Sequence, residues 1–210
     1  MTLELKQVQA LQNARPLFSP VSLKLEAGKL ATIMGPSGCG KSTLLTAICG
    51  NLSPVFTLKG DIVLNGKSII SIPMKKRKVG ILFQDDLLFP HMDVAENLAF
   101  ALPPGTPKPL GRQKISAALQ SAGLSGFEKR DPATLSGGQR ARISLFRSLI
   151  AEPEAILLDE PFSKLDLQLR EQIRRFVFHT IRKMHIPALL VTHDPRDCPE
   201  GQGLRLTLDK

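Results

Sequence analysis

Tryptophan and tyrosine are absent from the sequence, and phenylalanine is its only large aromatic residue. Single-stranded RNA is commonly bound by stacking bases on aromatic side chains of a sheet, and no such set can be identified here. The net charge of +9 and the isoelectric point near 9.7 suit nucleic acid, an anionic membrane surface and phosphate ligands alike. The densest basic run, residues 75–78, is interpreted as a solvated turn rather than a binding patch. The charge alone does not identify the binding partner. We expect that nucleic acid is not a partner of this protein.

Cysteine is also scarce, with single residues at positions 39, 49 and 198. An odd and sparse set in a chain of this length argues for reduced thiols rather than a disulfide framework. No cluster of cysteine and histidine has the spacing of zinc ligands. We therefore expect neither structural disulfides nor a zinc site.

Long apolar runs are missing, because none approaches the roughly 18–20 residues that span a bilayer. The N-terminal stretch MTLELKQVQ has no basic segment followed by an apolar core, so no signal peptide is predicted. Hydrophobic residues make up 42% and charged residues 22% of the 210-residue chain, which is ordinary globular usage. We expect a folded protein that stays in the cytoplasm.

Strands and helices alternate along the chain. Val21, Leu23 and Leu25 alternate with polar residues, which predicts half-buried antiparallel strands at the front, and Asn65-Gly66 predicts a hairpin. The apolar runs KLATIMG, KVGILFQ, AILLDE and ALLVTHD predict short buried strands, a helix is expected over 167–185, and a last strand over 203–209. A helical pattern covers residues 93–149, except for the proline-rich stretch 102–111, which is expected to be irregular and exposed.

This order predicts an α/β fold. It consists of a core with a mainly parallel sheet, a flanking antiparallel β-subdomain and an inserted α-helical subdomain. The phosphate loop predicted at residues 35–42 marks this core as a P-loop NTPase core. We expect a single domain over 1–210, in which approximately 1–90 and 150–210 form the core with the β-subdomain. Residues 91–149 are assigned to the helical subdomain.

A phosphate-binding loop is predicted at residues 35–42, GPSGCGKS, which match the pattern GxxxxGK[ST]. The glycines let the backbone N–H groups wrap a phosphate chain, and the following helix adds its positive N-terminal end. Lys41 is expected to reach the β- and γ-phosphates, and the Ser42 hydroxyl to ligate Mg²⁺. Alkylation of Cys39 is expected to block ATP binding. The residues assigned to the nucleotide are Gly35, Pro36, Ser37, Gly38, Cys39, Gly40, Lys41, Ser42 and Thr43.

A metal-holding carboxylate is predicted at the end of AILLDE, residues 155–160, which has the form of a Walker B strand. Asp159 would lie near the phosphate loop and hold Mg²⁺, and Glu160 would polarise the attacking water as general base. Taken alone, such a carboxylate pair can equally cap a helix. The phosphate loop elsewhere in the chain favours the catalytic interpretation.

Two further polar residues end predicted strands, where ligands of open α/β sheets gather. His193 follows ALLVT and can donate to a γ-phosphate, although a lone histidine is more often structural. Gln84 ends KVGILF and can orient water or contact the metal, with a surface amide as the rival interpretation.

The pentapeptide LSGGQ, residues 135–139, places two glycines at the start of a helical pattern. Its plain interpretation is a helix N-cap. A hydroxyl, bare backbone N–H groups and a helix N-terminus also form an anion site.

The phosphate loop, Gln84, LSGGQ, AILLDE and His193, in this order, make the sequence resemble an ATP-binding cassette (ABC) ATPase over nearly its whole length. The resemblance implies ATP hydrolysis by a homodimer of two copies arranged head to tail. Ser136, Gly137, Gly138 and Gln139 would then bind the γ-phosphate of ATP held by the other copy. Residues 163–166 match the D-loop of the family, with Lys164 where alanine is more common.

One departure from the family concerns adenine, which these ATPases usually stack on an aromatic residue just after the first strand. That place falls near Leu11 or Gln12, and Phe18 is the nearest aromatic candidate. A second departure is Phe146, which stands after LSGGQ where small residues are common.

The segment 84–102 is similar to bacterial importer cassettes of the thiamine, ferric iron, molybdate and polyamine groups. There a groove receives a short helix of the permease, and the apolar candidates to line it are Leu87, Leu88, Phe89, Pro90 and Met92. Ordinary packing explains any single one of them equally well.

The resemblance thus implies an ATP-hydrolysing subunit that powers a solute importer at the cytoplasmic face of the bacterial inner membrane. Its partners would be transmembrane permease subunits and, indirectly, a substrate-binding protein. The alternative is an exporter or lipoprotein-release complex, and a soluble ABC ATPase of translation or DNA repair is disfavoured further.

Overall fold

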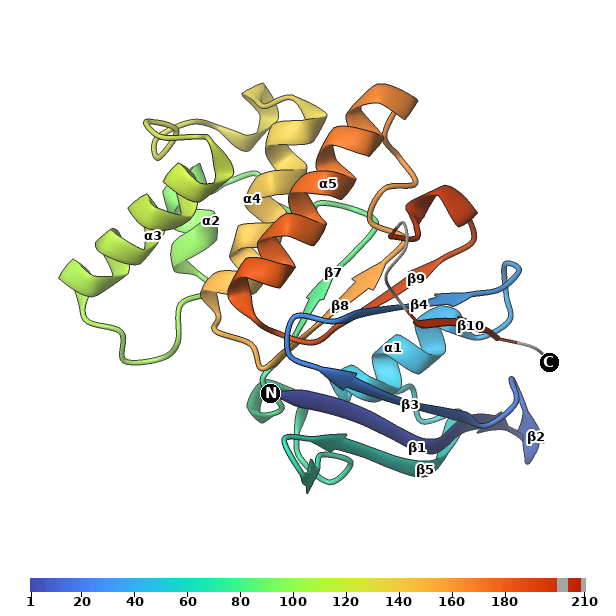
Figure 1. Cartoon of the computed structure of the whole chain (residues 1–210). Coiled ribbons are helices and arrows are strands. Elements are labelled where there is room, and N and C mark those ends of the chain that lie inside the picture. The colour runs from blue at the N-terminus through green and yellow to red at the C-terminus, as the bar shows by residue number, and fades with distance from the viewer. Residues whose placement is uncertain (200–203, 209–210) are drawn as a thin grey trace. The chain divides into compact units, whose positions relative to one another are not determined.

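The structure is a computed structural model that describes residues 1–199 and 204–208 (Figure 1). The chain divides into two compact units. The first comprises Met1–Ile81, Glu154–Glu160 and the described residues from Phe178 onward; the second comprises Leu82–Pro153 and Pro161–Val177. No helix of the described part is long and apolar enough to cross a membrane.

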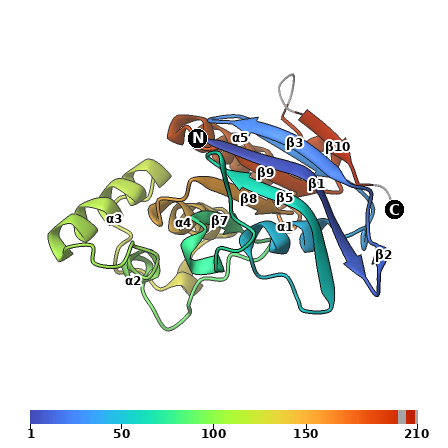
Figure 2. The ribbon, with the colours of Figure 1, turned by 90° about the horizontal axis from the view of Figure 1, so that it is seen from below.

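An antiparallel sheet forms from the front of the chain, as the alternating pattern predicts. Strand β1 (Thr2–Gln12) pairs with both β3 (Val21–Glu26) and β5 (Phe56–Leu64), so it lies between them in Figure 2. Buried and exposed residues alternate strictly along β3, because one face of the sheet covers the core. The short strands β2 (Arg15–Pro16) and β6 (Lys67–Ser68) add hairpin partners to β1 and β5.

The predicted hairpin at Asn65-Gly66 is confirmed. Leu64 pairs with Lys67 across the turn, and both turn residues have positive φ angles, 50° and 78°. Two consecutive positive φ values define the tight hairpin turn that matches strand twist, which is why asparagine followed by glycine is suited to it.

A second sheet has the strand order β10-β4-β9-β8-β7. Its strands are β4 (Leu30–Met34), β7 (Val79–Leu82), β8 (Ala155–Asp159), β9 (Ala188–Thr192) and β10 (Leu204–Thr207). The pairs β10–β4, β4–β9 and β8–β9 are parallel. The predicted α/β class is therefore confirmed. Of the predicted last strand, Gly203 and Asp209 lie outside the described residues.

Helix α1 (Lys41–Cys49) contacts β1 of one sheet and β8 of the other, and it lies between them (Figure 1). Its buried side chains include Leu44, Leu45 and Ile48, which join one core with the inward leucines of β1 and β3. Gly50, with a φ of 84°, ends the helix in the left-handed conformation that glycine adopts without strain. The helix that follows the phosphate loop is thus fixed on both sides by apolar burial.

The basic run 75–78 is only partly the solvated turn that we expect. Its three lysines are exposed, but Arg77 is buried. The Arg77 guanidinium donates to the carbonyls of Ala47 and Ile48 at 2.8 and 2.9 Å, and also to those of Ile70 and Ile72. The guanidinium thus adds donors to carbonyls at the C-terminal end of α1, where the helix itself supplies few.

The second unit is mainly helical. Helices α2 (Val94–Ala99), α3 (Lys108–Ala122) and α4 (Gly137–Ile150) contact one another, and α5 (Leu167–Met184) begins in this unit. Short 3₁₀ turns occur at Met74–Lys76, Pro132–Thr134 and Pro195–Asp197.

The proline-rich stretch 102–111 is not irregular throughout, so that expectation is wrong in its second half. Helix α3 begins at Lys108, directly after Pro107, and Pro109 lies in its first turn. Proline is tolerated there because the first N–H groups of a helix have no partner within the helix. Gly111 is buried, and a Cβ placed on it would lie 3.0 Å from Leu102 Cδ1.

Candidate functional site

The predicted phosphate loop lies between the carboxyl end of β4 and the first residue of α1. Gly38 and Gly40 have φ angles of 77° and 98°, which a residue with a side chain rarely adopts. Lys41 is buried apart from 5% of its side-chain surface, and its Nζ donates to the carbonyls of Gly35 and Pro36 at 2.8 and 3.0 Å. The backbone forms the tight loop that close approach to phosphate oxygens requires.

The loop rests on the hydrophobic core. Phe18 is fully buried, and a Cβ placed on Gly40 would lie 2.6 Å from Phe18 Cδ1. Phe18 thus packs against the loop from the core side. Its ring has no exposed face on which a base could stack. Cys39 is 1% exposed, and its Sγ would lie 2.7 Å from a Cβ on Gly35. Its thiol is packed in the core and against Gly35, so a reagent must open this packing to alkylate it.

Asp159 ends β8 within reach of α1. Its Oδ1 accepts a hydrogen bond from the Ser42 hydroxyl at 3.3 Å. Burial raises the pKa of Asp159, and Glu160 adds to this, while the Ser42 hydrogen bond opposes it. A partly buried carboxylate beside a hydroxyl is a pair of hard oxygen donors, and a divalent cation would compensate the charge that burial disfavours.

The backbone of Glu160, directly after β8, leaves the extended conformation of the strand. Its backbone N–H still donates to the carbonyl of Val191 on β9 at 3.0 Å, but its φ is +45°. One carboxylate oxygen, Oε1, lies 3.7 Å from Lys41 Nζ, and the other, Oε2, lies 3.0 Å from His193 Nδ1. Three residues predicted for the site thus lie together, with the Glu160 carboxylate between Lys41 and His193.

The loop that carries His193 is fixed by a buried hydrogen bond that sequence reasoning missed. Thr192 Oγ1 donates to Asp197 Oδ2 at 2.7 Å, and both residues are 1% exposed. The backbone N–H of Asp194 then donates to Thr192 Oγ1 at 3.1 Å. Asp197 closes the turn directly after His193, while the imidazole itself stays half exposed at 52%.

The residues 136–139 and Gln84 belong to the second unit. Ser136 is the N-cap of α4, and its Oγ accepts from the Gln139 N–H at 3.3 Å while Gln139 Oε1 accepts from the Ser136 N–H at 2.9 Å. This reciprocal pair is a capping box. Gly138 is packed against α5, where a Cβ would lie 2.7 Å from Leu169 Cδ1. The plain interpretation of LSGGQ as a helix cap is therefore correct, and it leaves Ser136 exposed.

Gln84 is exposed two residues beyond β7, and it is followed by an ordered turn that we call the 85–93 segment. The fully buried Asn97 holds this segment, because its Nδ2 donates to the carbonyls of Phe89, Met92 and Asp93, each at 3.1 Å. Leu87 is 54% exposed. The amide of Asn97 thus replaces the backbone pairing that an irregular turn lacks.

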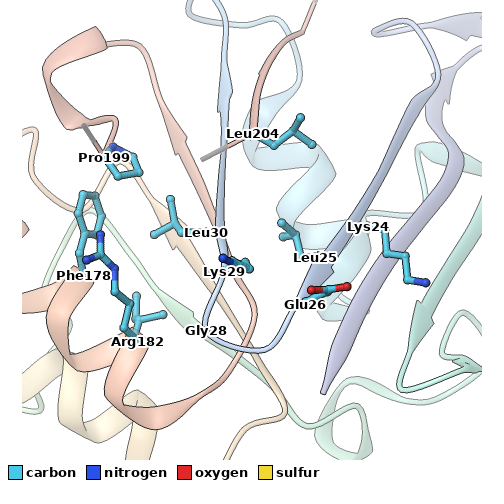
Figure 3. Close-up of a pocket in the computed structure, with 11 residues that line it drawn as sticks. Lys24, Leu25, Glu26, Gly28, Lys29, Leu30, Phe178, Arg182, Pro199 and Leu204 are labelled. Carbon is cyan, nitrogen blue, oxygen red and sulfur yellow. The ribbon is translucent and has the colours of Figure 1, made fainter. Parts of the chain in front are cut away.

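A cavity of about 510 Å³ lies elsewhere in the first unit (Figure 3). It is lined by Glu26, Gly28, Lys29 and Leu30 at the amino end of β4 and by Phe178 and Arg182 of α5. Because the phosphate loop follows the carboxyl end of β4, the cavity and the loop are separated by the length of that strand. No predicted site residue lines this cavity.

Comparison with known proteins agrees with this fold and with these motifs. The sequence profile described as ABC transporter matches residues 18–163. An uncharacterized ABC transporter ATP-binding protein of Escherichia coli K12, YnjD, is 47% identical over 188 residues, which cover 90% of this chain and 87% of that protein. The chain belongs to the ABC transporter ATP-binding family, and it is an ATPase.

Two relatives carry a more specific name, spermidine/putrescine import ATP-binding protein PotA. The one from Mesoplasma florum is 36% identical, and the one from Bacteroides thetaiotaomicron is 38% identical, each over 93% of this chain. The chain covers only 55% and 42% of these two proteins. Its membership of the family makes the chain an ATP-binding subunit of a transporter. Such subunits generally have permease partners and form dimers.

Proposed function

We propose that this ATPase powers a bacterial solute importer and that it works as a head-to-tail homodimer at the cytoplasmic face of the inner membrane. Import is supported by the names of the PotA relatives and by the similarity of the segment 84–102 to importer cassettes. The observation that carries the catalytic part of the proposal is the Glu160 carboxylate between Lys41 and His193.

In this proposal Lys41 binds the β- and γ-phosphates together with the loop N–H groups. ATP would draw Nζ from the carbonyls of Gly35 and Pro36, since phosphate oxygens are stronger acceptors for an ammonium group. Glu160 accepts a proton from the attacking water, and His193 holds the carboxylate through Nδ1; in its protonated form it also donates through Nε2 toward the γ-phosphate. Asp197 keeps the His193 turn in place.

Ser42 and Asp159 are proposed to hold Mg²⁺, with Gln84 completing the site. The donor set fits, because Mg²⁺ prefers one or two protein oxygen ligands together with phosphate oxygens. When bound, the ion neutralises charge that develops on the phosphates during transfer. Burial raises the pKa of Asp159, so the charged form of this carboxylate is disfavoured without a cation. A bound Mg²⁺ would stabilise the charged form.

The signature residues 136–139 are proposed to bind the γ-phosphate held by the other copy. The exposed Ser136 hydroxyl and the N-terminal end of the 14-residue helix α4 support this role. Because each ATP would then contact both copies, hydrolysis requires the dimer.

A permease helix is proposed to dock on the 85–93 segment, where Leu87 offers an exposed apolar side chain. The assignment of 91–149 as a helical subdomain around this surface is part of the same proposal. An exporter or lipoprotein-release ATPase is the second candidate, because the E. coli relative is uncharacterized.

The dimer is tested by mixing two inactive variants. Ser136→Arg keeps its own phosphate loop, and Lys41→Ala keeps its own signature. In a head-to-tail dimer, a mixed pair contains one intact composite site, so an equal mixture should recover up to about a quarter of the wild-type rate. Separate preparations should stay inactive. An inactive mixture, with mixed dimers demonstrated, would show that Ser136 does not act on the partner's nucleotide.

The direction of transport is tested with membrane proteins encoded beside the gene. Vesicles that carry the assembled complex with ATP on the ATPase side are offered radiolabelled solutes, beginning with polyamines. An importer accumulates solute on the side of the ATPase. Movement to the opposite side would favour the exporter.

A further inference from the structure

Helix α4 holds the 85–93 segment through side chains that the family motifs do not include. Ser144 Oγ donates to the carbonyl of Asp86 at 2.9 Å. Arg147 donates through Nη2 to the same carbonyl at 2.9 Å and through Nη1 to that of Leu87 at 2.7 Å. Two helix residues thus fix two consecutive peptides of the segment.

The backbone at this point is unusual. Leu87 has a φ of +48°, although it carries a side chain and is more than half exposed. A left-handed conformation in such a residue persists only when its surroundings impose it. The donors from Ser144 and Arg147 supply that constraint, so this turn is a defined element of the second unit.

Arg140 connects the same turn to the signature. Its Nη1 donates to the carbonyl of Leu135 at 2.7 Å, and its Nε lies 3.3 Å from Asp86 Oδ2. The Leu135 carbonyl belongs to the peptide whose N–H is that of Ser136, the N-cap of α4. One guanidinium therefore bridges a carboxylate of the 85–93 segment and the peptide that orients the signature serine.

We propose that Asp86 and Arg140 are positioning residues for the signature turn, and that they link it to the 85–93 segment. Asp86 sets the direction of the Arg140 guanidinium, and Arg140 fixes the Leu135–Ser136 peptide and with it the Ser136 hydroxyl. The link rests on the proposed function in one respect, namely that Ser136 takes part in hydrolysis. A permease that displaces the segment would then change the geometry of Ser136 within the same unit.

An ordinary surface ion pair would contribute little, and this alternative has to be distinguished. The Arg140 and Asp86 side chains are 39% and 32% exposed, so they are neither fully solvated nor buried. The bridge differs from an isolated pair because the same guanidinium also donates to a backbone carbonyl. Removing Asp86 should therefore affect Ser136 through Arg140, whose carbonyl partner Leu135 directly precedes Ser136.

The test uses Asp86→Asn, Arg140→Met and the double variant. Amide hydrogen exchange of residues 135–140 should be faster in each, by about three- to tenfold, the effect of losing one ordinary hydrogen bond. The double variant should match Arg140→Met alone, because both changes break one bridge. ATP turnover should also fall in each of the three variants. KM for ATP should stay within about twofold of wild type, since the changes lie outside the phosphate loop.

Two controls separate positioning from general destabilisation. Glu152→Gln breaks the ion pair with Lys114 in the same unit and should change neither quantity. Arg140→Lys keeps the charge but cannot reach both acceptors with a planar fork, so it should restore less than half of the lost turnover. Faster exchange in α3 as well as in residues 135–140 would overturn the proposal in favour of a structural role.

Unchanged exchange at residues 135–140 in Asp86→Asn would also overturn it. Faster exchange with unchanged turnover supports the link, and it refutes the role of Ser136 in hydrolysis. The proposal and the function on which it rests can therefore fail separately.

Discussion

Glu160 Oε2 lies 3.0 Å from His193 Nδ1, at the carboxyl ends of two neighbouring parallel strands. A carboxylate that acts as general base must be ionised and can then only accept here, so the proposed mechanism requires the proton of this contact on Nδ1. The carboxylate that we propose as general base then orients the imidazole through Nδ1, and Nε2 takes no part in this contact. The two residues are 33 positions apart in the sequence, and they meet because β8 and β9 pair in register.

Replacing Glu160 with glutamine should lower ATP turnover by about 10²–10⁴-fold, the usual contribution of a general base. The amide keeps the size of the side chain but does not accept a proton from water. ATP affinity should change little, and size-exclusion chromatography with ATP should show a persistent dimer. Turnover close to the wild-type rate would refute the assignment of Glu160.

Replacing Asp197 with alanine should slow hydrolysis although Asp197 is proposed to contact no nucleotide. The substitution leaves the buried Thr192 hydroxyl without its acceptor, which costs about 1–3 kcal/mol of unfolding free energy. The His193 turn loses its closure, so kcat should fall while KM for ATP stays close to wild type. Thr192→Val removes the donor to the buried Asp197 carboxylate and the acceptor of the Asp194 N–H, so it should destabilise the protein at least as much. An Asp197→Ala protein with wild-type kcat would show that the turn does not depend on this bond.

Gly40→Ala and Gly38→Ala should differ in stability although both residues have left-handed φ angles. A Cβ on Gly40 meets Phe18 at 2.6 Å, whereas nothing lies within 4 Å of a Cβ on Gly38. Gly38→Ala should therefore cost only the backbone term of about 1–2 kcal/mol. Gly40→Ala should cost about 1–3 kcal/mol more because it overpacks the core. Chemical denaturation measures both, and equal losses would mean that Phe18 moves aside freely.

The pH dependence of stability should contain a contribution from Glu154. Lys78 and Asn65 donate to this carboxylate, and the Lys78 hydrogen bond lowers its pKa below the usual value. A lowered pKa in the folded state means that the stabilisation is fully present above the unfolded value of about 4.3 and is lost as the pH falls through the folded value.

The comparison of Glu154→Gln with the wild type isolates this effect. The wild type should be more stable by about 0.5–1 kcal/mol between pH 6 and 8, the size expected for a partly exposed pair. The difference should shrink below about pH 4.5 as the wild-type carboxylate takes up a proton. A difference that grows toward acid pH would contradict the assigned direction of the shift.

The sequence predicts the phosphate loop, the Walker B strand and the parallel sheet because their signals are local. Glycine spacing in residues 35–42 and uninterrupted apolar runs report backbone geometry and burial directly. The resulting proximity of Ser42 to Asp159, and of Lys41 to Glu160, follows from strands that end at one edge of a sheet.

The burial of Arg77, Asp197 and Phe18 could not be predicted in the same way. Arg77 stands in a run of lysines, and only the carbonyls of α1, about thirty residues earlier, make its burial favourable. Asp197 is one of two nearby aspartates, and the chain gives no sign of which one accepts from Thr192. Phe18 was the candidate for adenine because it is aromatic, but its partner is a glycine 22 residues away, a contact that only the fold creates.

The left-handed backbone of Glu160 sets hydrolysis against thermal stability at a single position. A φ of +45° costs a residue with a side chain about 1–2 kcal/mol, and glycine would escape most of that cost. A search for heat-resistant variants would therefore favour glycine here, and each such variant would lack the general base that we propose. Selection for transport alone keeps glutamate in a conformation that selection for durability would remove.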